Sequence, residues 1–432
     1  MKADLEQVLA GDTGRLFGSL APRRMAAKQE LMGGTKGSDW GSVFSALDPL
    51  SPLPHDSAVY CERPERPLAR LEATVQFTKE PRLYLVSGHI GSGKSTELNQ
   101  FVERISRSHE CLLEQVDLYL EHDSPDELDL LLLTGMSLAA LNEGMGWKQG
   151  FSLRHLLSSR TYGTPDSPYS SWITLGLSGN RRDARDHLRE SVRQRRVELF
   201  EHLSSIAARI RARSREPLLV FDGFDKVGLK RLERLFESAL AWGYFPASVV
   251  LTVPLSFLFS PTFARTQALF GGTAIVPAVQ VEGRDRSPGR EGIEWMRNVL
   301  KVREVEQYFD TTASDYLITR TGGILRDFLR VSRESVLNAH VKTLDRVTLE
   351  HATHAAREFA NDMLRAVHQD HLRLLYAVHQ TGQAIGDPSF LQMIDSGQII
   401  EYREDSSWYV VHPLLRDAVE GLTTQIAAEP KA

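Results

Sequence analysis

A glycine-rich octapeptide between an apolar run and an amphipathic stretch constrains the fold of this chain most. Residues 88–95 read Gly-His-Ile-Gly-Ser-Gly-Lys-Ser. The preceding run, Arg82 to Ser87, is apolar and has the length of a buried strand. The following apolar side chains recur three or four residues apart, which predicts a helix: Leu98, Phe101, Val102 and Ile105. Strand, glycine loop and helix in this order predict a parallel α/β sheet.

The loop's residue types suit a polyphosphate anion. Glycines let backbone N–H groups and a helix N-terminus approach the phosphates. Lys94 would place its ammonium on the β and γ phosphates, and the Ser95 hydroxyl would ligate Mg²⁺. The alternative is a glycine turn with an incidental lysine. We expect ATP, with Mg²⁺, to be bound by Gly88, His89, Ile90, Gly91, Ser92, Gly93, Lys94, Ser95 and Thr96.

Two acids follow another apolar run, Leu218 to Asp222. A hard cation at a phosphate site needs oxygen ligands at the carboxyl edge of the sheet, so we expect Asp222 to be a metal ligand. Asp225 could orient or deprotonate the attacking water. The alternative for either acid is a cap on a helix that begins near Lys226.

A threonine and an arginine complete the candidate catalytic set. Thr252 lies in the apolar run Ser248 to Val253, where a neighbouring strand could report on the γ-phosphate; it could equally be an ordinary strand residue. Arg326 follows the glycine pair of Thr321 to Asp327 and could reach the γ-phosphate from a mobile lid. Its alternative is a surface Arg–Asp pair.

The rest of the chain predicts a principal α/β domain with smaller helical parts. Two further strands are expected at Cys111 to Asp117 and, as a weaker edge strand, at Thr273 to Val281. Helices are expected at 3–10, after the cap Ser124, through 185–213, and over 289–363 with Thr348 as a cap. From 367 the pattern predicts helices at 371–379 and 388–394, strands at 398–402 and 408–411, and a closing helix from Pro413.

These segments predict four parts and one fold class. The parts are a lead-in (1–58), an ATPase core (59–285), a helical lid (286–366) and a winged-helix-like domain (367–432). The fold class is α/β, a P-loop NTPase parallel sheet with a helical lid and a C-terminal winged-helix-like domain. The length of 432 residues suits several domains of this size.

Composition excludes several other classes. Hydrophobic residues are 42% and charged residues 25%, as in globular proteins. The net charge of -5 is carried by the last 46 residues, so a globally basic nucleic-acid footprint is missing. Cys61 and Cys111 form no zinc or disulfide pattern. The sequence has no membrane span or export signal, and we expect a cytoplasmic protein without a membrane partner.

Together the motifs resemble the STAND and AAA+ branch of P-loop ATPases, which includes NACHT-type signalling ATPases and archaeal-style initiators. The resemblance implies the metal and water site at Asp222 and Asp225, the strand threonine at Thr252 and the lid arginine at Arg326. The chain departs from the family's pattern at one position, and the role of a second residue is left open. Lys226 stands where NACHT-like proteins usually have an acid, which implies slow hydrolysis, and Arg265 is only a candidate for an arginine lent to a neighbouring subunit.

The resemblance implies an ATP-driven switch that transmits its nucleotide state to a protein partner, as bacterial relatives do in phage defence or mobile elements. Self-assembly into a homo-oligomer stays open. One alternative is a DNA-binding AAA+ regulator or initiator, which is less favoured because residues 388–394 carry no basic side chain. Another is a nucleotide-binding scaffold with little turnover. No Asn-Lys-x-Asp selects guanine, and no complete transporter signature is present.

Overall fold

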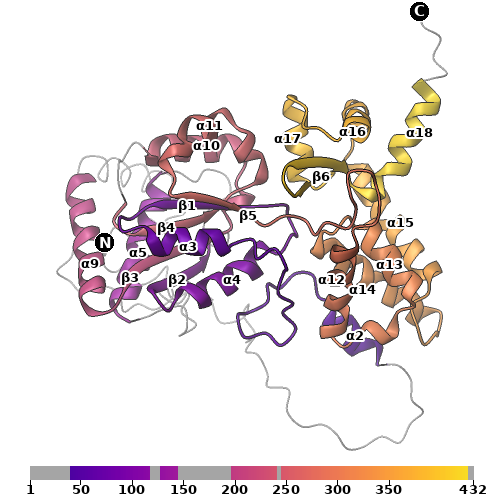
Figure 1. The fold of residues 1–432 in the computed structure, drawn as a ribbon, viewed down its shortest axis with the longest axis horizontal. Helices are drawn as coiled ribbons and strands as arrows, with labels where there is room; N and C mark the ends of the chain where they lie inside the picture. The colour runs from indigo at the N-terminus through magenta and orange to yellow at the C-terminus, as the bar shows by residue number, and fades with distance from the viewer. Residues whose placement is uncertain (1–38, 117–126, 145–195, 241–244, 427–432) are drawn as a thin grey trace, which may run out of the picture. The chain divides into compact units, whose positions relative to one another are not determined.

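The computed structural model describes residues 39–116, 127–144, 196–240 and 245–426 (Figure 1). Three expected features lie outside them: the helix at 3–10, the cap at Ser124, and the first part of the helix expected at 185–213. Within the described residues, no helix is long and apolar enough to cross a membrane.

Five parallel strands form the central sheet in the order β2-β3-β4-β1-β5. They are β1 (Leu83–Ser87), β2 (His109–Gln115), β3 (Glu216–Asp222), β4 (Ser248–Thr252) and β5 (Gly272–Ile275). All five expected strands are confirmed, and β5 is an edge strand that ends six residues before its expected end. Since β4 separates β1 from β3, the glycine loop, the end of β4 and the end of β3 meet at one sheet edge.

Both faces of this sheet are covered by helices, because alternate strand residues point to opposite sides. Tyr84 and Val220 pack with α3 (Ala69–Phe77) and α4 (Lys94–Ile105). On the other face, Leu85 and Phe221 belong to the cluster formed with α5 (Glu127–Asn142), α9 (Arg196–Arg213) and α10 (Leu229–Leu240). The three inner strands, β3, β4 and β1, are therefore buried on both sides, as their apolar runs predict.

The chain between β4 and β5 is made of short turns and one helix. Its elements are η4 (Leu255–Phe259), α11 (Pro261–Thr266) and η5 (Gln267–Leu269), and η3 (Phe224–Lys226) follows β3. The Ser260 hydroxyl caps α11 by accepting a hydrogen bond from the Phe263 amide, and Pro261 occupies the first turn.

The expected lid is confirmed as helical. Its elements are α12 (Arg290–Val302), η6 (Glu306–Tyr308), α13 (Thr311–Arg320), α14 (Leu325–Val341) and α15 (Leu349–Arg365). Thr348 caps α15 in a capping box completed by His351. The lead-in adds a helix here that we had not expected: α2 (Trp40–Ala46) packs on α14, and the Arg333 guanidinium lies 3.8 Å from the centre of the Phe44 ring.

The C-terminal elements follow the expected order. They are α16 (Gln369–Thr381), α17 (Pro388–Asp395), an antiparallel hairpin of β6 (Ile399–Arg403) and β7 (Ser407–Val411), η7 (Pro413–Leu415) and α18 (Arg416–Ile426). Asp387 caps α17, and Gly382 ends α16 in the left-handed conformation that glycine favours. We call these residues, 369–426, the C-terminal module.

Candidate nucleotide site

The glycine loop has the backbone conformation that its sequence requires. Gly88, Gly91 and Gly93 have φ angles of 147°, 85° and 98°, which side-chain-bearing residues rarely adopt. A Cβ on Gly88 would also lie 2.2 Å from the Val276 carbonyl oxygen. Gly93 precedes α4 directly, so the helix N-terminus faces the loop. The loop is therefore a backbone-lined cradle for an anion.

Lys94 is buried within this cradle. Its Nζ donates hydrogen bonds of 3.0 Å to the carbonyl oxygens of both Gly88 and His89. The same atom lies 2.9 Å from Oδ2 of Asp225. Backbone carbonyls and one carboxylate thus hold the ammonium at the position that a phosphate would share.

The two predicted metal ligands, Asp222 and Ser95, lie side by side in the same pocket. Burial raises the pKa of Asp222, and nearby Asp225 adds to the rise, whereas hydrogen bonding with Ser95 and Thr252 opposes it. Thr252 is fully buried, and its hydroxyl accepts a hydrogen bond of 2.8 Å from the Gly223 amide. Through this bond Thr252 holds the backbone directly after Asp222, and its contact with the γ-phosphate remains a prediction.

Asp225 is on η3, and its side chain is mostly buried. It lines the same pocket as Lys94 and Asp222. The alternative that it caps the helix after β3 is not what the structure shows, because α10 begins only at Leu229. Lys226 also lines the pocket, where the resemblance led us to look for an acid.

The lid closes over the loop at α14. The Arg326 amide donates a hydrogen bond of 3.0 Å to the Gly91 carbonyl oxygen. A Cβ on Gly91 would lie 2.6 Å from the Arg326 Cβ, so glycine is also needed for this close approach. The exposed Arg326 side chain lines the pocket, and it makes no hydrogen bond or ion pair with the described residues. It is thus available for an anionic ligand.

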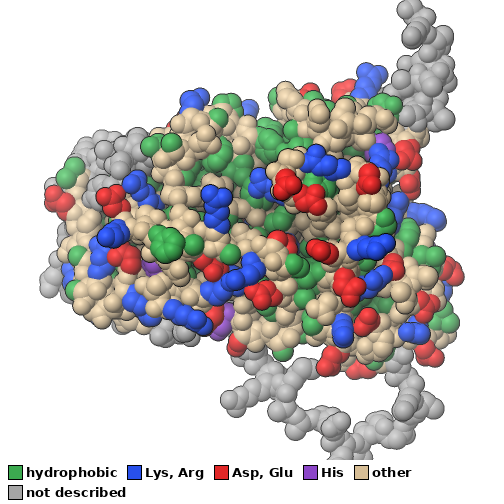
Figure 2. Space-filling view, viewed as in Figure 1, with side chains coloured by type: hydrophobic (Ala, Val, Ile, Leu, Met, Phe, Trp, Pro, Cys, Tyr) green, Lys and Arg blue, Asp and Glu red, His purple; other side chains and the backbone are tan. Residues whose placement is uncertain are grey.

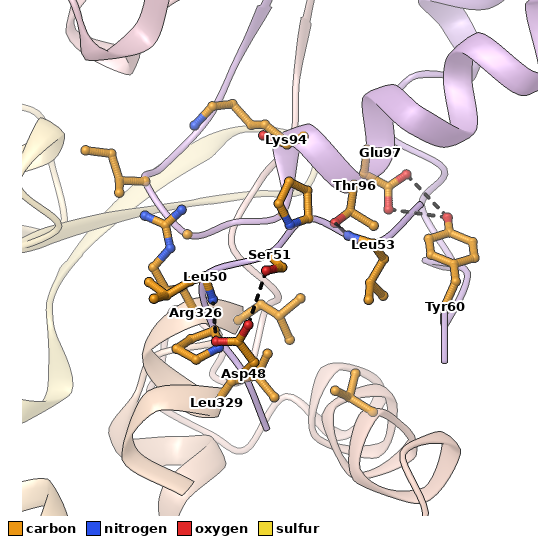
Figure 3. A pocket seen from close by; sticks show the side chains of 18 of the residues that line it. Asp48, Leu50, Ser51, Leu53, Tyr60, Lys94, Thr96, Glu97, Arg326 and Leu329 are labelled. Atoms are coloured by element: carbon orange, nitrogen blue, oxygen red, sulfur yellow. Dashed lines mark hydrogen bonds between the residues drawn. The ribbon is translucent and has the colours of Figure 1, made fainter. Parts of the chain in front are cut away.

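The lead-in takes part in the site, which the sequence did not indicate. Figure 3 shows Asp48, Leu50, Ser51 and Leu53 in the pocket that also holds Lys94 and Arg326. The Leu53 amide donates a 3.1 Å hydrogen bond to the Thr96 hydroxyl, which anchors the segment to α4. In the sequence, residues 48–53 look like a proline-rich spacer, and they carry no basic residue or motif that would indicate a phosphate ligand.

Arg63 is a second residue that sequence reasoning missed. Only 2% of its surface is exposed, and it donates to the Ser92 carbonyl oxygen in the loop and, at 2.9 Å, to that of Pro277. It lies 3.9 Å from Glu97 and 5.3 Å from the centre of the Trp295 ring on α12. One buried guanidinium therefore ties the loop, α4 and the lid together. In the sequence it looked like a surface charge between two glutamates.

His89 turns away from the pocket toward the C-terminal module. The Glu401 amide of β6 donates a 2.7 Å hydrogen bond to His89 Nε2. Complete burial lowers the pKa of His89 to about 3, so the ring is neutral at pH 7 and can accept this bond. The predicted role of His89 in nucleotide binding rests on its backbone.

Lys94, Ser95, Asp222, Asp225 and Arg326 line one pocket of about 440 Å³. It is large enough for a nucleotide-sized ligand. The donor set fits ATP with Mg²⁺: a glycine cradle, one buried ammonium, a serine hydroxyl beside a carboxylate, and a free guanidinium. Among the described residues, no three His, Cys, Asp or Glu side chains cluster into a protein-only metal site. Mg²⁺ here would depend on Ser95, Asp222 and the ligand's own oxygens.

The candidate trans arginine lies on α11, away from this pocket. Arg265 is 63% exposed, and its guanidinium lies 2.8 Å from Glu237. Its role toward a neighbouring subunit remains a prediction.

Comparison with known proteins gives distant structural similarity. No family model matches the sequence, and no curated protein matches it. The chain is similar to Drosophila ORC bound to DNA (14% identity, TM-score 0.44, 98% of this chain and 99% of that one). It is also similar to Cdc6p from Pyrobaculum aerophilum (14%, 0.41, 88% and 97%) and to the Thermotoga maritima RuvB branch migration motor (13%, 0.38, 83% and 92%).

Proposed function

We propose that this chain is an ATP-binding and ATP-hydrolysing molecular switch of the STAND/AAA+ type. The observation that carries the proposal is the convergence of Lys94, Ser95, Asp222, Asp225 and Arg326 on one pocket. These residues come from the sheet edge and from the lid, so a bound triphosphate would bridge the two. We also propose that the chain is divided into a lead-in (1–58), an ATPase core (59–285), a helical lid (286–366) and a winged-helix-like domain (367–432).

In this proposal each side chain has one task. Lys94 leaves the carbonyl oxygens of Gly88 and His89 and binds the β and γ phosphates. Ser95 and Asp222 hold Mg²⁺, which supplies charge neutralisation when bound. Once Lys94 has moved, Asp225 is free to accept a hydrogen bond from the attacking water. Arg326 binds the γ-phosphate from the lid and so links lid position to nucleotide state.

The proposed output is a protein partner rather than DNA. From residue 387 to the C-terminus the chain has eight acidic and three basic residues, and such a balance repels a phosphate backbone. On the face shown in Figure 2, acidic and basic side chains of the described residues are intermingled. A cytoplasmic switch in phage defence or a mobile element is consistent with this proposal, as is assembly into a homo-oligomer.

Replacement of Lys94 tests the site itself. We expect Lys94→Ala to lose ATP binding in isothermal titration calorimetry, because the only buried ammonium at the described loop is removed. Lys230→Ala, on the exposed face of α10, is the matched control and should bind like the wild type. Full affinity in Lys94→Ala would refute the assignment.

Turnover is tested separately from binding. We expect Asp225→Asn to bind Mg-ATP but to release phosphate at least about 100-fold more slowly, since general-base catalysis contributes roughly that factor. Asp222→Asn should release phosphate slowly too, and its ATP binding should no longer depend on Mg²⁺. If wild-type protein binds ATP and releases phosphate no faster than Asp225→Asn, the chain is a nucleotide-binding scaffold and not an ATPase.

A further inference from the structure

A cavity separate from the nucleotide pocket lies at the C-terminal module and has a volume of about 420 Å³. It is bounded by the chain at 282–286, by the end of α16 with the residues after it (378–384), and by β7. Every residue of β7 lines this cavity, and none of its lining residues lines the nucleotide pocket. We call it the module groove. Its volume is that of a ligand-binding site, and the proposed ATPase chemistry uses none of it.

Strand β7 has an open edge at this groove, because in the described part of the chain it pairs with β6 alone. The Tyr409 amide points away from β6 and donates a 3.0 Å hydrogen bond to the Gly382 carbonyl oxygen. Since backbone groups alternate between the two sides of a strand, those of Val411 point the same way. The Arg416 side chain donates to the Val411 carbonyl oxygen at 3.2 Å. The Tyr409 carbonyl oxygen and the Val411 amide make no hydrogen bond with the described residues.

This free acceptor and free donor match another peptide backbone. In a parallel ladder, one residue of the added strand donates its N–H to a carbonyl oxygen and accepts from the N–H two residues farther along. Tyr409 and Val411 have this spacing, and Val410 between them also lines the groove. A phosphate group has only acceptor oxygens and cannot satisfy the Tyr409 carbonyl oxygen. The edge therefore favours an extended peptide over a nucleic acid.

The groove also carries positive charge. Apart from one histidine, its titratable lining side chains are three arginines and one glutamate. Arg416 binds Glu282 through two N–H groups and neutralises it. Arg284 and Arg286 are exposed, and across the described ranges neither lies within ion-pair distance of a carboxylate. Asp285 between them accepts instead from the backbone amide two residues later. Two guanidiniums are thus available to an anionic ligand.

Neutral partners hold both guanidiniums in place. Arg284 donates a 2.9 Å hydrogen bond to the Ser406 carbonyl oxygen, and its guanidinium lies 4.9 Å from the centre of the Trp408 ring. Arg286 donates at 3.1 Å to the His379 carbonyl oxygen, near the end of α16. These contacts position the two charges before a ligand binds, which lowers the entropy that binding costs.

We propose that the module groove is the docking site for the protein partner and binds an extended acidic segment of it as a strand added to β7. This inference deepens the proposed function, on which it rests for its role, because it names the chemistry of the partner that the switch acts on. The segment's backbone binds the Tyr409 carbonyl oxygen and the Val411 amide, and its carboxylates bind Arg284 and Arg286. The backbone bonds supply affinity, and the two charges select an acidic sequence.

A fluorescein-labelled peptide of alternating glutamate and valine tests the charge, because valine favours an extended chain and glutamate supplies the carboxylates. We expect the full chain to bind it in fluorescence anisotropy. The double variant Arg284→Gln, Arg286→Gln should bind about tenfold more weakly, as for the loss of two exposed ion pairs. Glutamine keeps an N–H donor for the carbonyl oxygens that the arginines bind. Arg373→Gln, on the exposed side of α16 and outside the groove, is the matched control and should bind like the wild type.

The backbone part of the proposal is tested separately. The same peptide with every backbone nitrogen methylated keeps its carboxylates but has no N–H donors, and we expect it to bind more weakly than the unmethylated peptide. Hydrogen exchange at the Val411 amide should slow when the unmethylated peptide binds. Exchange at the Tyr409 amide should not change, because Gly382 already accepts its hydrogen bond.

Equal peptide binding by the wild type and the double variant, equal binding of the methylated peptide, or unchanged exchange at Val411 would overturn the inference. So would a labelled single-stranded oligonucleotide that binds more tightly than the peptide and displaces it. Calorimetry with ATP distinguishes this failure from that of the proposed function, since the double variant should bind ATP like the wild type. A wild type that binds ATP but not the peptide refutes the docking site alone. One that binds the peptide but not ATP refutes the switch and leaves the docking site.

Discussion

At the residue scale, one buried charge, Arg63, connects parts of the structure that are far apart in the sequence. Arg63 makes polar contacts with the loop, α4 and the chain after β5 although it is almost fully buried. A buried guanidinium stabilises the fold only together with its polar partners, because removing one side of the interaction leaves the other side buried and unpaired. Its neighbour Arg66 has the same chemistry but is half exposed.

We expect Arg63→Ala to lower the free energy of unfolding by about 3 kcal/mol, as for other buried ion pairs that lose one partner. The loss removes the Arg63 guanidinium from both Glu97 and the Ser92 carbonyl oxygen. Arg66→Ala is the control and should change the same quantity by less than about 1 kcal/mol. Urea unfolding followed by circular dichroism measures both. Equal effects of the two substitutions would contradict the structure.

The deficit of Arg63→Ala should depend on pH. Burial raises the pKa of Glu97 above its ordinary value of 4.5, while Arg63 and Arg104 oppose the rise. Without Arg63 the folded-state pKa rises further, so the folded protein binds more protons than the unfolded one from about pH 4.5 upward to that pKa. Stability then falls as pH rises through this window. We expect the gap between variant and wild type to be full at pH 7 and to shrink toward pH 4.5.

At the element scale, the lid and the loop meet through two glycines that look alike in sequence but differ in space. Gly91 faces the Arg326 Cβ, whereas a Cβ on Gly93 would have no atom nearer than 3.8 Å. Both residues have a positive φ, so alanine at either adds backbone strain of about 1–2 kcal/mol. Only alanine at Gly91 also collides with α14.

We therefore expect Gly91→Ala to separate α14 from the loop and Gly93→Ala to leave it in place. The direct measurement is hydrogen exchange at the Arg326 amide, which donates to the Gly91 carbonyl oxygen. Its protection should fall in Gly91→Ala beyond any global destabilisation seen in Gly93→Ala. If both variants lose protection equally, strain and not the collision governs lid closure.

The elements themselves were largely predictable, whereas their contacts were not. Short apolar runs indicated every strand of the sheet, and local sequence patterns indicated the helical lid and the C-terminal hairpin. The strand order places Thr252 between the loop and Asp222, and this depends on long-range pairing that no window of sequence contains. The packing of α2 on the lid and of residues 48–53 in the pocket could not be predicted from the sequence either, since prolines and short polar runs indicate only an extended chain.

At the scale of the whole molecule, the lid and the C-terminal module are joined at the glycine pair. The Tyr402 hydroxyl donates a 2.9 Å hydrogen bond to the Gly322 carbonyl oxygen, and both groups are buried. Arg416 makes a two-pronged ion pair with Glu282, in the segment between β5 and the lid. In the proposed switch, a lid that follows the nucleotide would therefore carry the module with it, and this would link the proposed ATP site to the proposed partner.

The acidic charge of the C-terminal module favours the proposed protein partner over DNA. Its hairpin turn carries Glu404 and Asp405, where a DNA-binding wing would present cations to phosphates. We expect the full chain to show no salt-dependent binding to labelled duplex DNA in fluorescence anisotropy. Reversing the turn with Glu404→Lys and Asp405→Lys should create weak binding whose log–log salt slope is about -1.8, for two new phosphate contacts. Salt-dependent binding by the wild type that the reversal does not strengthen would place DNA on another surface and favour the initiator alternative.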